Sequence, residues 1–120
     1  MKLIDANVIL RYLLADIPEQ WEAASAVIES GAYTIPMIIA EVVYVLQGVY
    51  NVPREKIAET MIRLLQTVSV VEPRIIACAL ELYRISALDF ADCTLIAYNH
   101  VDGADVFSFD RKLNKHLMSS

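Results

Sequence analysis

Short apolar runs alternate along the chain with longer segments in which apolar residues recur at three- and four-residue spacing. Four runs have the length and composition of buried strands, at residues 2–4, 33–35, 69–71 and 106–109. The longer segments predict helices over residues 7–14, 18–30, 37–50, 53–67, from 73, from about 88 and from 110. Residues 99–105 are polar, contain a glycine and are expected to form a loop.

Strands that alternate with helices indicate a parallel sheet with helices on both faces. We therefore expect an α/β protein with a three-layer α/β/α fold and a short, mostly parallel central sheet. A length of 120 residues corresponds to one ordinary domain, and we expect a single domain over residues 1–120.

Composition adds an expectation about partners. The apolar fraction of 57% exceeds the roughly 45–50% usual for soluble domains, so part of the apolar surface is expected to pack against another protein. The net charge of −5 argues against a broad basic face for nucleic acid. It leaves room for a nuclease whose acidic residues converge on bound cations.

Charged residues also bear on location. Arg11, Asp16 and Glu41 interrupt the apolar segments before any reaches the ~20 residues that a membrane span needs. Asp5 falls where the apolar region of a secretory signal would begin. We expect a cytoplasmic protein without a membrane span. The two cysteines lie in predicted helices without zinc-site spacing, and we expect reduced core thiols at Cys78 and Cys93.

Asp5 and Asp110 each follow a predicted strand and precede a predicted helix. Ligands of parallel α/β sheets bind at this end of the strands, so the two carboxylates can face each other if the first and last strands are neighbours. A helix N-cap is the alternative role for each, because Asp satisfies the free backbone N–H groups there.

Glu41 is the only charged residue between Pro36 and Tyr50. An unpaired buried carboxylate is costly, so a lone acid beside the apolar positions of a helix favours a functional role. An exposed rim position or a salt bridge is the alternative.

Asp89 and Asp92 frame the start of another predicted helix. Their spacing makes Asp89 the natural cap and Asp92 a first-turn acid that is free for a ligand. Carboxylates held close together raise one another's pKa unless a cation neutralises them, and oxygen ligands alone favour Mg²⁺ or Mn²⁺. Zinc is not favoured, because His100 and His116 form no ligand pattern with cysteine or glutamate.

Four stretches, in order, resemble the PIN-domain nucleases and, within them, the VapC-like toxins of toxin–antitoxin pairs. They read LIDAN at 3–7, IAEV at 39–42, DFAD at 89–92 followed by LIA at 95–97, and FSFDR at 107–111. The resemblance covers essentially the whole chain. It implies a PIN-like version of the three-layer α/β/α fold.

The resemblance also implies a site. Asp5, Glu41, Asp92 and Asp110 correspond to an acidic quartet that binds Mg²⁺ or Mn²⁺, and these acids are the catalytic and metal-binding candidates. The implied activity is a toxin endoribonuclease that hydrolyses RNA phosphodiester bonds with metal-activated water, using one or two ions. Supporting polar residues, which would orient the carboxylates, are Asn7 and Ser108, where threonine is common in the family. Asp89 remains a competing ligand for the metal.

Cations near these acids are candidates for contacts with RNA phosphates. Arg111, Lys112 and Lys115 follow Asp110 directly, and Arg11 lies in the helix after the first strand. A solvated cationic helix is the alternative for the first three. The resemblance further implies a homodimer and a cognate antitoxin protein.

Two other functions stay open. One is a non-enzymatic acidic α/β receiver or interaction module, but a receiver needs a phosphorylatable Asp after a central strand, and Val71 here is followed by Glu72 and Pro73. The other is a PIN domain that acts in RNA processing or as an inert scaffold. The sequence separates this second possibility poorly from a toxin.

Overall fold

The computed structural model describes residues 1–118, which form seven helices and three strands. In chain order the elements are β1 (Lys2–Leu3), α1 (Ala6–Leu14), α2 (Pro18–Glu29), β2 (Ala32–Thr34), α3 (Pro36–Gly48), α4 (Arg54–Leu64), β3 (Ser69–Val70), α5 (Pro73–Ile85), α6 (Phe90–Asp102) and α7 (Arg111–Asn114). The α/β fold expected from the sequence is confirmed, with helices as the larger part.

The sheet has the order β1-β2-β3, and both pairings are parallel. The Lys2 backbone N–H donates to the Gly31 carbonyl, just before β2, over 3.2 Å, and the Ile4 N–H donates to the Tyr33 carbonyl of β2 over 3.0 Å. The buried hydroxyl of Thr34 donates to the Ile4 carbonyl over 3.1 Å and extends this pairing by one residue. Strand β1 is therefore one edge of the sheet.

Helix boundaries follow local chemistry. Pro18, Pro36 and Pro73 begin their helices, because proline lacks the N–H that the first turn leaves unpaired anyway. Gly103 ends α6 with a φ of +69°, a left-handed conformation that glycine adopts at low cost.

Helix α6 continues to Asp102, so the expectation of a loop over residues 99–105 is wrong for its first part. The polar residue Asn99 stays in the helix because its side chain is hydrogen-bonded. Its amide donates to the carbonyls of Ala104 and Met118 over 2.9 and 3.1 Å, and its oxygen accepts from the Met118 N–H over 2.8 Å.

The core is formed by helix faces on which apolar residues recur at three- and four-residue spacing. Ile57 and Met61 of α4 and Ile76, Leu80 and Tyr83 of α5 are fully buried. Burial of such side chains supplies the main favourable term in folding, at ~1.5–3 kcal/mol for each large apolar side chain. The two thiols are free, as expected, and burial raises the pKa of both.

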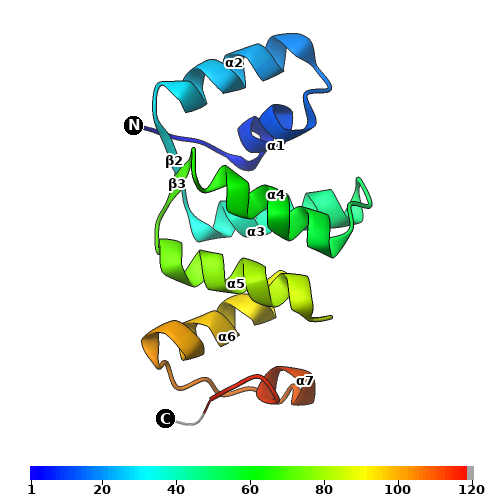
Figure 1. The fold of residues 1–120 in the computed structure, drawn as a ribbon, viewed down its shortest axis with the longest axis vertical. Coiled ribbons are helices and arrows are strands. Elements are labelled where there is room, and N and C mark those ends of the chain that lie inside the picture. The colour runs from blue at the N-terminus through cyan, green and yellow to red at the C-terminus, as the bar shows by residue number, and fades with distance from the viewer. Residues whose placement is uncertain (119–120) are drawn as a thin grey trace.

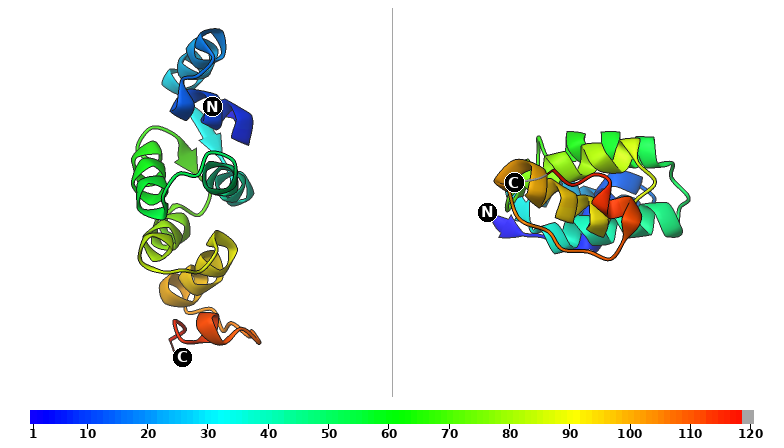
Figure 2. Two further views of the ribbon diagram at one scale, coloured as in Figure 1. Left: turned by 90° about the vertical axis from the view of Figure 1, so that its right-hand side faces the viewer. Right: turned by 90° about the horizontal axis from the view of Figure 1, so that it is seen from below.

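The chain is elongated, with principal extents of 48 × 29 × 18 Å and a radius of gyration of 15.0 Å. A compact domain of this length has a radius of gyration of about 14 Å. Helices α1 and α2 lie at one end of the long axis and α7 at the other, with α3 to α6 between them (Figures 1 and 2).

The expectation of a fourth strand at residues 106–109 is wrong, because within residues 1–118 this segment pairs with no strand. Its side chains alternate between half-buried and exposed positions, and Phe107 and Phe109 are 85% and 91% exposed. The segment has the composition of a strand but lies beside α6 and α7, away from β1 (Figure 1). No helix in the described part of the chain could span a membrane.

Candidate active site

The N-terminus of α6 carries two of the predicted acids. The Asp89 carboxylate accepts a hydrogen bond from the Asp92 backbone N–H over 2.9 Å and is the N-cap. Asp92 is half-buried in the first turn, and no ion pair to it occurs within residues 1–118. Burial raises the pKa of the Asp92 carboxyl, and the negative charges of Asp89 and Asp110 raise it further.

Asp110 lies close enough to Asp92 for its negative charge to raise the pKa of the Asp92 carboxyl. Its carboxylate caps α7 by accepting from the N–H groups of Lys112 and Leu113 over 2.8 and 3.1 Å. Its own N–H donates to the Ser108 hydroxyl over 3.0 Å, so Ser108 orients the backbone that carries Asp110. We call Asp89, Asp92 and Asp110 the α6 acid cluster.

Asp5 lies elsewhere in the fold, at the start of α1. Its carboxylate accepts from the Val8 N–H over 3.0 Å, so it is an N-cap, as the alternative reading of this residue proposed. Asn7 follows on the exposed side of α1. Asp5 is not among the charges that raise the pKa of Asp92.

Glu41 is exposed on α3, although the next two residues along the helix, Val42 and Val43, are buried. Glu41 is therefore not a buried charge, and it has the exposed rim position that was the alternative for this residue. The helix turns by about 100° per residue, so one charged position next to an apolar stripe can face solvent.

Of the four predicted acids, Asp92 and Asp110 lie near each other, whereas Asp5 begins α1 and Glu41 lies exposed on α3. Carboxylate oxygens are the donors that Mg²⁺ prefers. Within residues 1–118, however, no group of three or more acidic, histidine or cysteine side chains could hold a metal ion. The donor chemistry fits a divalent cation, whereas the placement of the donors in a single chain does not.

Arg11 already has partners. Its guanidinium forms a salt bridge of 2.8 Å with Asp16 and donates to the Tyr50 hydroxyl over 3.3 Å. Only 12% of the side chain is exposed, and its Nε has no hydrogen-bond partner among the described residues. An RNA phosphate would have to displace or share these partners.

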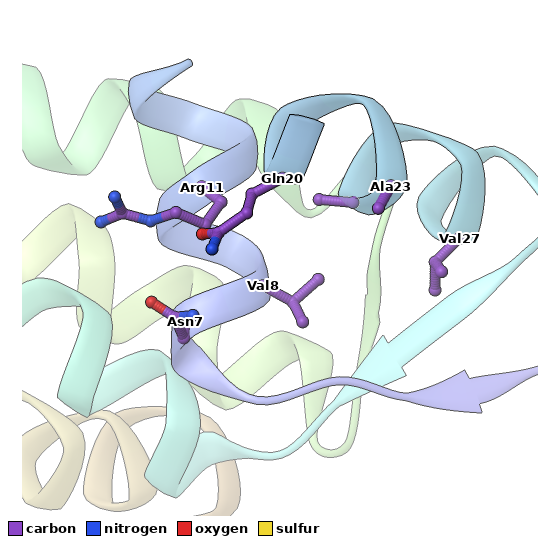
Figure 3. A pocket seen from close by; sticks show the side chains of 7 residues that line it. Asn7, Val8, Arg11, Gln20, Ala23 and Val27 are labelled. Atoms are coloured by element: carbon purple, nitrogen blue, oxygen red, sulfur yellow. The ribbon is translucent and has the colours of Figure 1, made fainter. Parts of the chain in front are cut away.

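Arg11 also lines a cavity of about 210 Å³ between α1 and α2. Figure 3 shows Asn7, Val8 and Arg11 on α1 opposite Gln20, Ala23 and Val27 on α2. None of the predicted acids lines this cavity. It is an apolar groove with a polar rim, and it lacks the groups that phosphodiester hydrolysis needs.

The cations that follow Asp110 are available for phosphate contacts. Arg111, Lys112 and Lys115 are exposed, and within residues 1–118 none of them forms a salt bridge. Their position next to the α6 acid cluster is the one that an RNA backbone at that cluster would require.

Asn99 is the residue that the sequence reasoning missed. Its side chain, which lies on α6, is hydrogen-bonded to Ala104 and Met118, the two ends of the segment 104–118. Within this segment the Asn114 amide donates to the Ser108 carbonyl over 2.9 Å. The available signal was a lone amide after the apolar run 95–98, the same kind of isolation that made Glu41 conspicuous.

Comparison with known proteins agrees with this fold. The family model described as PIN domain matches residues 2–116, and PIN domains are generally nucleases. No curated protein and no solved structure gives a significant match. The match covers all of the elements from β1 to α7, and the chain therefore belongs to the PIN domain family.

Proposed function

We propose that this chain is an endoribonuclease that hydrolyses RNA phosphodiester bonds with the help of Mg²⁺ or Mn²⁺. The observation that carries the proposal is the PIN domain match over residues 2–116 in a chain that has acids at all four positions of the implied quartet. A divalent cation bound by such acids supplies the positive charge that phosphoryl chemistry needs.

Among the acids, Asp92 has the environment most typical of a ligand. It is half-buried beside two other carboxylates, and its side chain caps no helix, because Asp89 fills that role. Asp89 is committed to the backbone by its cap. This division of roles favours Asp92 over Asp89 as the group that reaches a cation.

The test is cleavage of RNA by the purified chain with Mg²⁺ or Mn²⁺, with and without a chelator. We expect cleavage that needs the cation and is lost in Asp92→Asn. Asp102→Asn is the matched control, because Asp102 is an exposed acid at the other end of α6. Cleavage that persists in chelator, or equally in both variants, would contradict the proposal.

We further propose that the ribonuclease is the toxin of a toxin–antitoxin pair. The exposed apolar side chains, among them Met37, Phe107 and Phe109, support a protein partner, since such side chains are often covered in a complex. We expect expression of the wild-type chain to arrest growth and expression of Asp5→Asn to be tolerated. A short neighbouring reading frame that relieves the arrest would identify the antitoxin. Cleavage without any effect on growth would favour a role in RNA processing instead.

A further inference from the structure

Arg54 begins α4, and its side chain reaches the end of α5 and the turn that leads into α6. Its Nε donates to the Tyr83 carbonyl, in the last turn of α5, over 3.0 Å. A terminal nitrogen of the same guanidinium donates to the Leu88 carbonyl, just before α6. Helix α5 lies between α4 and α6 (Figure 1), so one side chain links all three helices.

The charge of Arg54 is committed to these contacts. Its guanidinium carbon lies 3.8 Å from the centroid of the Tyr83 ring, and that ring packs edge to face on Phe90, the first residue of α6. Arg54 is half-buried, and within residues 1–118 it forms no salt bridge. A cation is favourable beside the last carbonyls of a helix, which have no partner within the helix.

Two further polar contacts at the Leu88 backbone are weak. The Leu88 N–H donates to the Ser86 hydroxyl over 3.4 Å, which is long for a hydrogen bond. The Cys93 thiol, a weak donor, lies 3.9 Å from the Leu88 carbonyl. Hydrogen bonds from a charged donor are roughly twice as strong as those between neutral groups. The guanidinium of Arg54 is therefore the strongest of the three contacts at this residue.

The Leu88 carbonyl connects Arg54 to the acids. A peptide unit is planar, so a contact that fixes this carbonyl also fixes the orientation of the Asp89 N–H. Asp89 is the N-cap whose carboxylate accepts from the Asp92 N–H. Arg54 thus sets the direction in which the first turn of α6, with Asp92, leaves the preceding turn.

The acids at this end of the molecule need such an anchor. Asp89 and Asp110 lie close enough to Asp92 for their charges to act on its carboxyl, and like charges repel. This repulsion favours movement of the first turn of α6 away from Asp110. Arg54 opposes the movement by holding the backbone at which that turn begins.

We propose that Arg54 is a positioning residue of the ribonuclease, which holds the N-terminus of α6 so that the Asp92 carboxylate keeps its place. This role rests on the proposed function, since it concerns the same reaction. Arg54 acts through the backbone, because its charge is not among those that shift the pKa of Asp92. Reacting groups must be held to within about 1 Å, and a distant residue that sets their position affects the rate of cleavage.

The anchor is tested without activity by amide hydrogen exchange, followed by NMR, in the wild-type chain and Arg54→Lys. Lysine keeps the charge but lacks the fork that binds two carbonyls and covers a ring. We expect exchange at the Asp92 and Cys93 amides to become roughly 10-fold faster, while the Met61 amide in α4 keeps its protection.

Arg63→Lys is the matched control for exchange, because Arg63 is exposed on the same helix and pairs with Glu59. It should leave exchange at Asp92 unchanged. Unchanged exchange at Asp92 in Arg54→Lys, or an equal increase throughout the chain, would overturn the anchor.

The effect on cleavage is measured as the single-turnover rate at saturating protein, together with the affinity for RNA. We expect Arg54→Lys to cleave roughly 10- to 100-fold more slowly. Its affinity for RNA should be unchanged, because the guanidinium donates to carbonyls of the protein.

Ile57→Val is the control for stability. Ile57 is fully buried on α4, and loss of one methyl group there lowers stability while the Arg54 contacts stay in place, so the rate should be that of the wild-type chain. A wild-type rate in Arg54→Lys, or an equal loss in Ile57→Val, would overturn the positioning role. If the wild-type chain cleaves no RNA, the proposed function fails, and the exchange rates still decide whether Arg54 anchors α6.

Discussion

The N-termini of α1 and α6 are built alike and have different surroundings. Asp5 accepts from the N–H three residues on, and Asp89 does the same at α6. At α6 a second acid, Asp92, follows in the first turn, and Asp110 approaches from another segment and adds to the rise in its pKa. At α1 no further acid follows in the first turn, and the basic residue of the last turn, Arg11, is paired with Asp16.

A capping aspartate therefore does not by itself mark a functional site. The cap needs only local backbone geometry, which any helix start supplies. A cluster of carboxylates needs segments from distant parts of the chain, and it costs free energy unless something compensates the repulsion. Segments from distant parts of the chain meet in this way at the α6 end, whereas the first turn of α1 contains no further acid.

The largest effect is expected from combining changes at the two ends. Asp5→Asn and Asp92→Asn should each reduce RNA cleavage roughly 100-fold or more, because loss of a direct ligand exceeds the 10–100-fold cost of losing a supporting residue. The double variant should be little worse than either, since groups that act as one unit are not additive. Multiplied effects in single-turnover cleavage would show that the two ends act separately.

The next largest effect is expected from weakening the packing of the C-terminal segment on the rest of the chain. Leu113 is 1% exposed and anchors α7, so Leu113→Ala should lower the free energy of unfolding by about 2–3 kcal/mol. Urea unfolding measures it. Leu117→Ala is the matched control, because Leu117 is only partly buried and should cost less. Equal losses would mean that α7 is not held by this side chain.

Removing a helix N-cap is expected to have a smaller effect on the free energy of unfolding. Asp89→Ala and Asp5→Ala should each lower the free energy of unfolding by about 1 kcal/mol, because a backbone N–H loses its acceptor. Asn retains the cap, so Asp89→Asn should keep both stability and most activity. Thermal unfolding and an RNA cleavage assay measure the two. An Asp89→Asn variant that is stable but inactive would transfer the ligand role from Asp92 to Asp89.

The smallest effect concerns RNA binding. Arg111→Gln and Lys112→Gln should each reduce the slope of log affinity against log salt by about 0.7, the value for one phosphate contact on a single strand. Arg11→Gln should leave the slope unchanged, because its guanidinium is held by Asp16 and Tyr50. Titrations of RNA binding at several salt concentrations measure these slopes. A lower slope for Arg11→Gln would show that RNA displaces those partners.

Much of the fold followed from local pattern. Pro18, Pro36 and Pro73 stand at helix starts, and the three- and four-residue spacing of apolar residues in α5 matches its buried face, which includes Ile76 and Tyr83. Helix periodicity depends on neighbours within one or two turns, so the sequence carries it directly. The cap at Asp89 was predictable for the same reason.

Contacts between distant segments were not predictable in this way. Residues 106–109 have strand composition, but a strand exists only when a second backbone supplies hydrogen-bond partners. Glu41 stands alone among apolar residues, yet its exposure depends on which way α3 is rotated against its neighbours. Neither the pairing of a strand nor the exposure of one helix position can be predicted from a short stretch of sequence.

By itself the sequence determined most of the helices, the three strands of the parallel sheet, the identity of the acids and membership of the PIN domain family, but it also indicated a strand at residues 106–109 that does not form. Only the tertiary structure decided which acids are neighbours: Asp92 shares its surroundings with Asp89 and Asp110, while Asp5 caps α1 apart from them. The reason is physical. Residue type and spacing set local conformation, whereas the meeting of distant carboxylates depends on the packing of whole helices against one another.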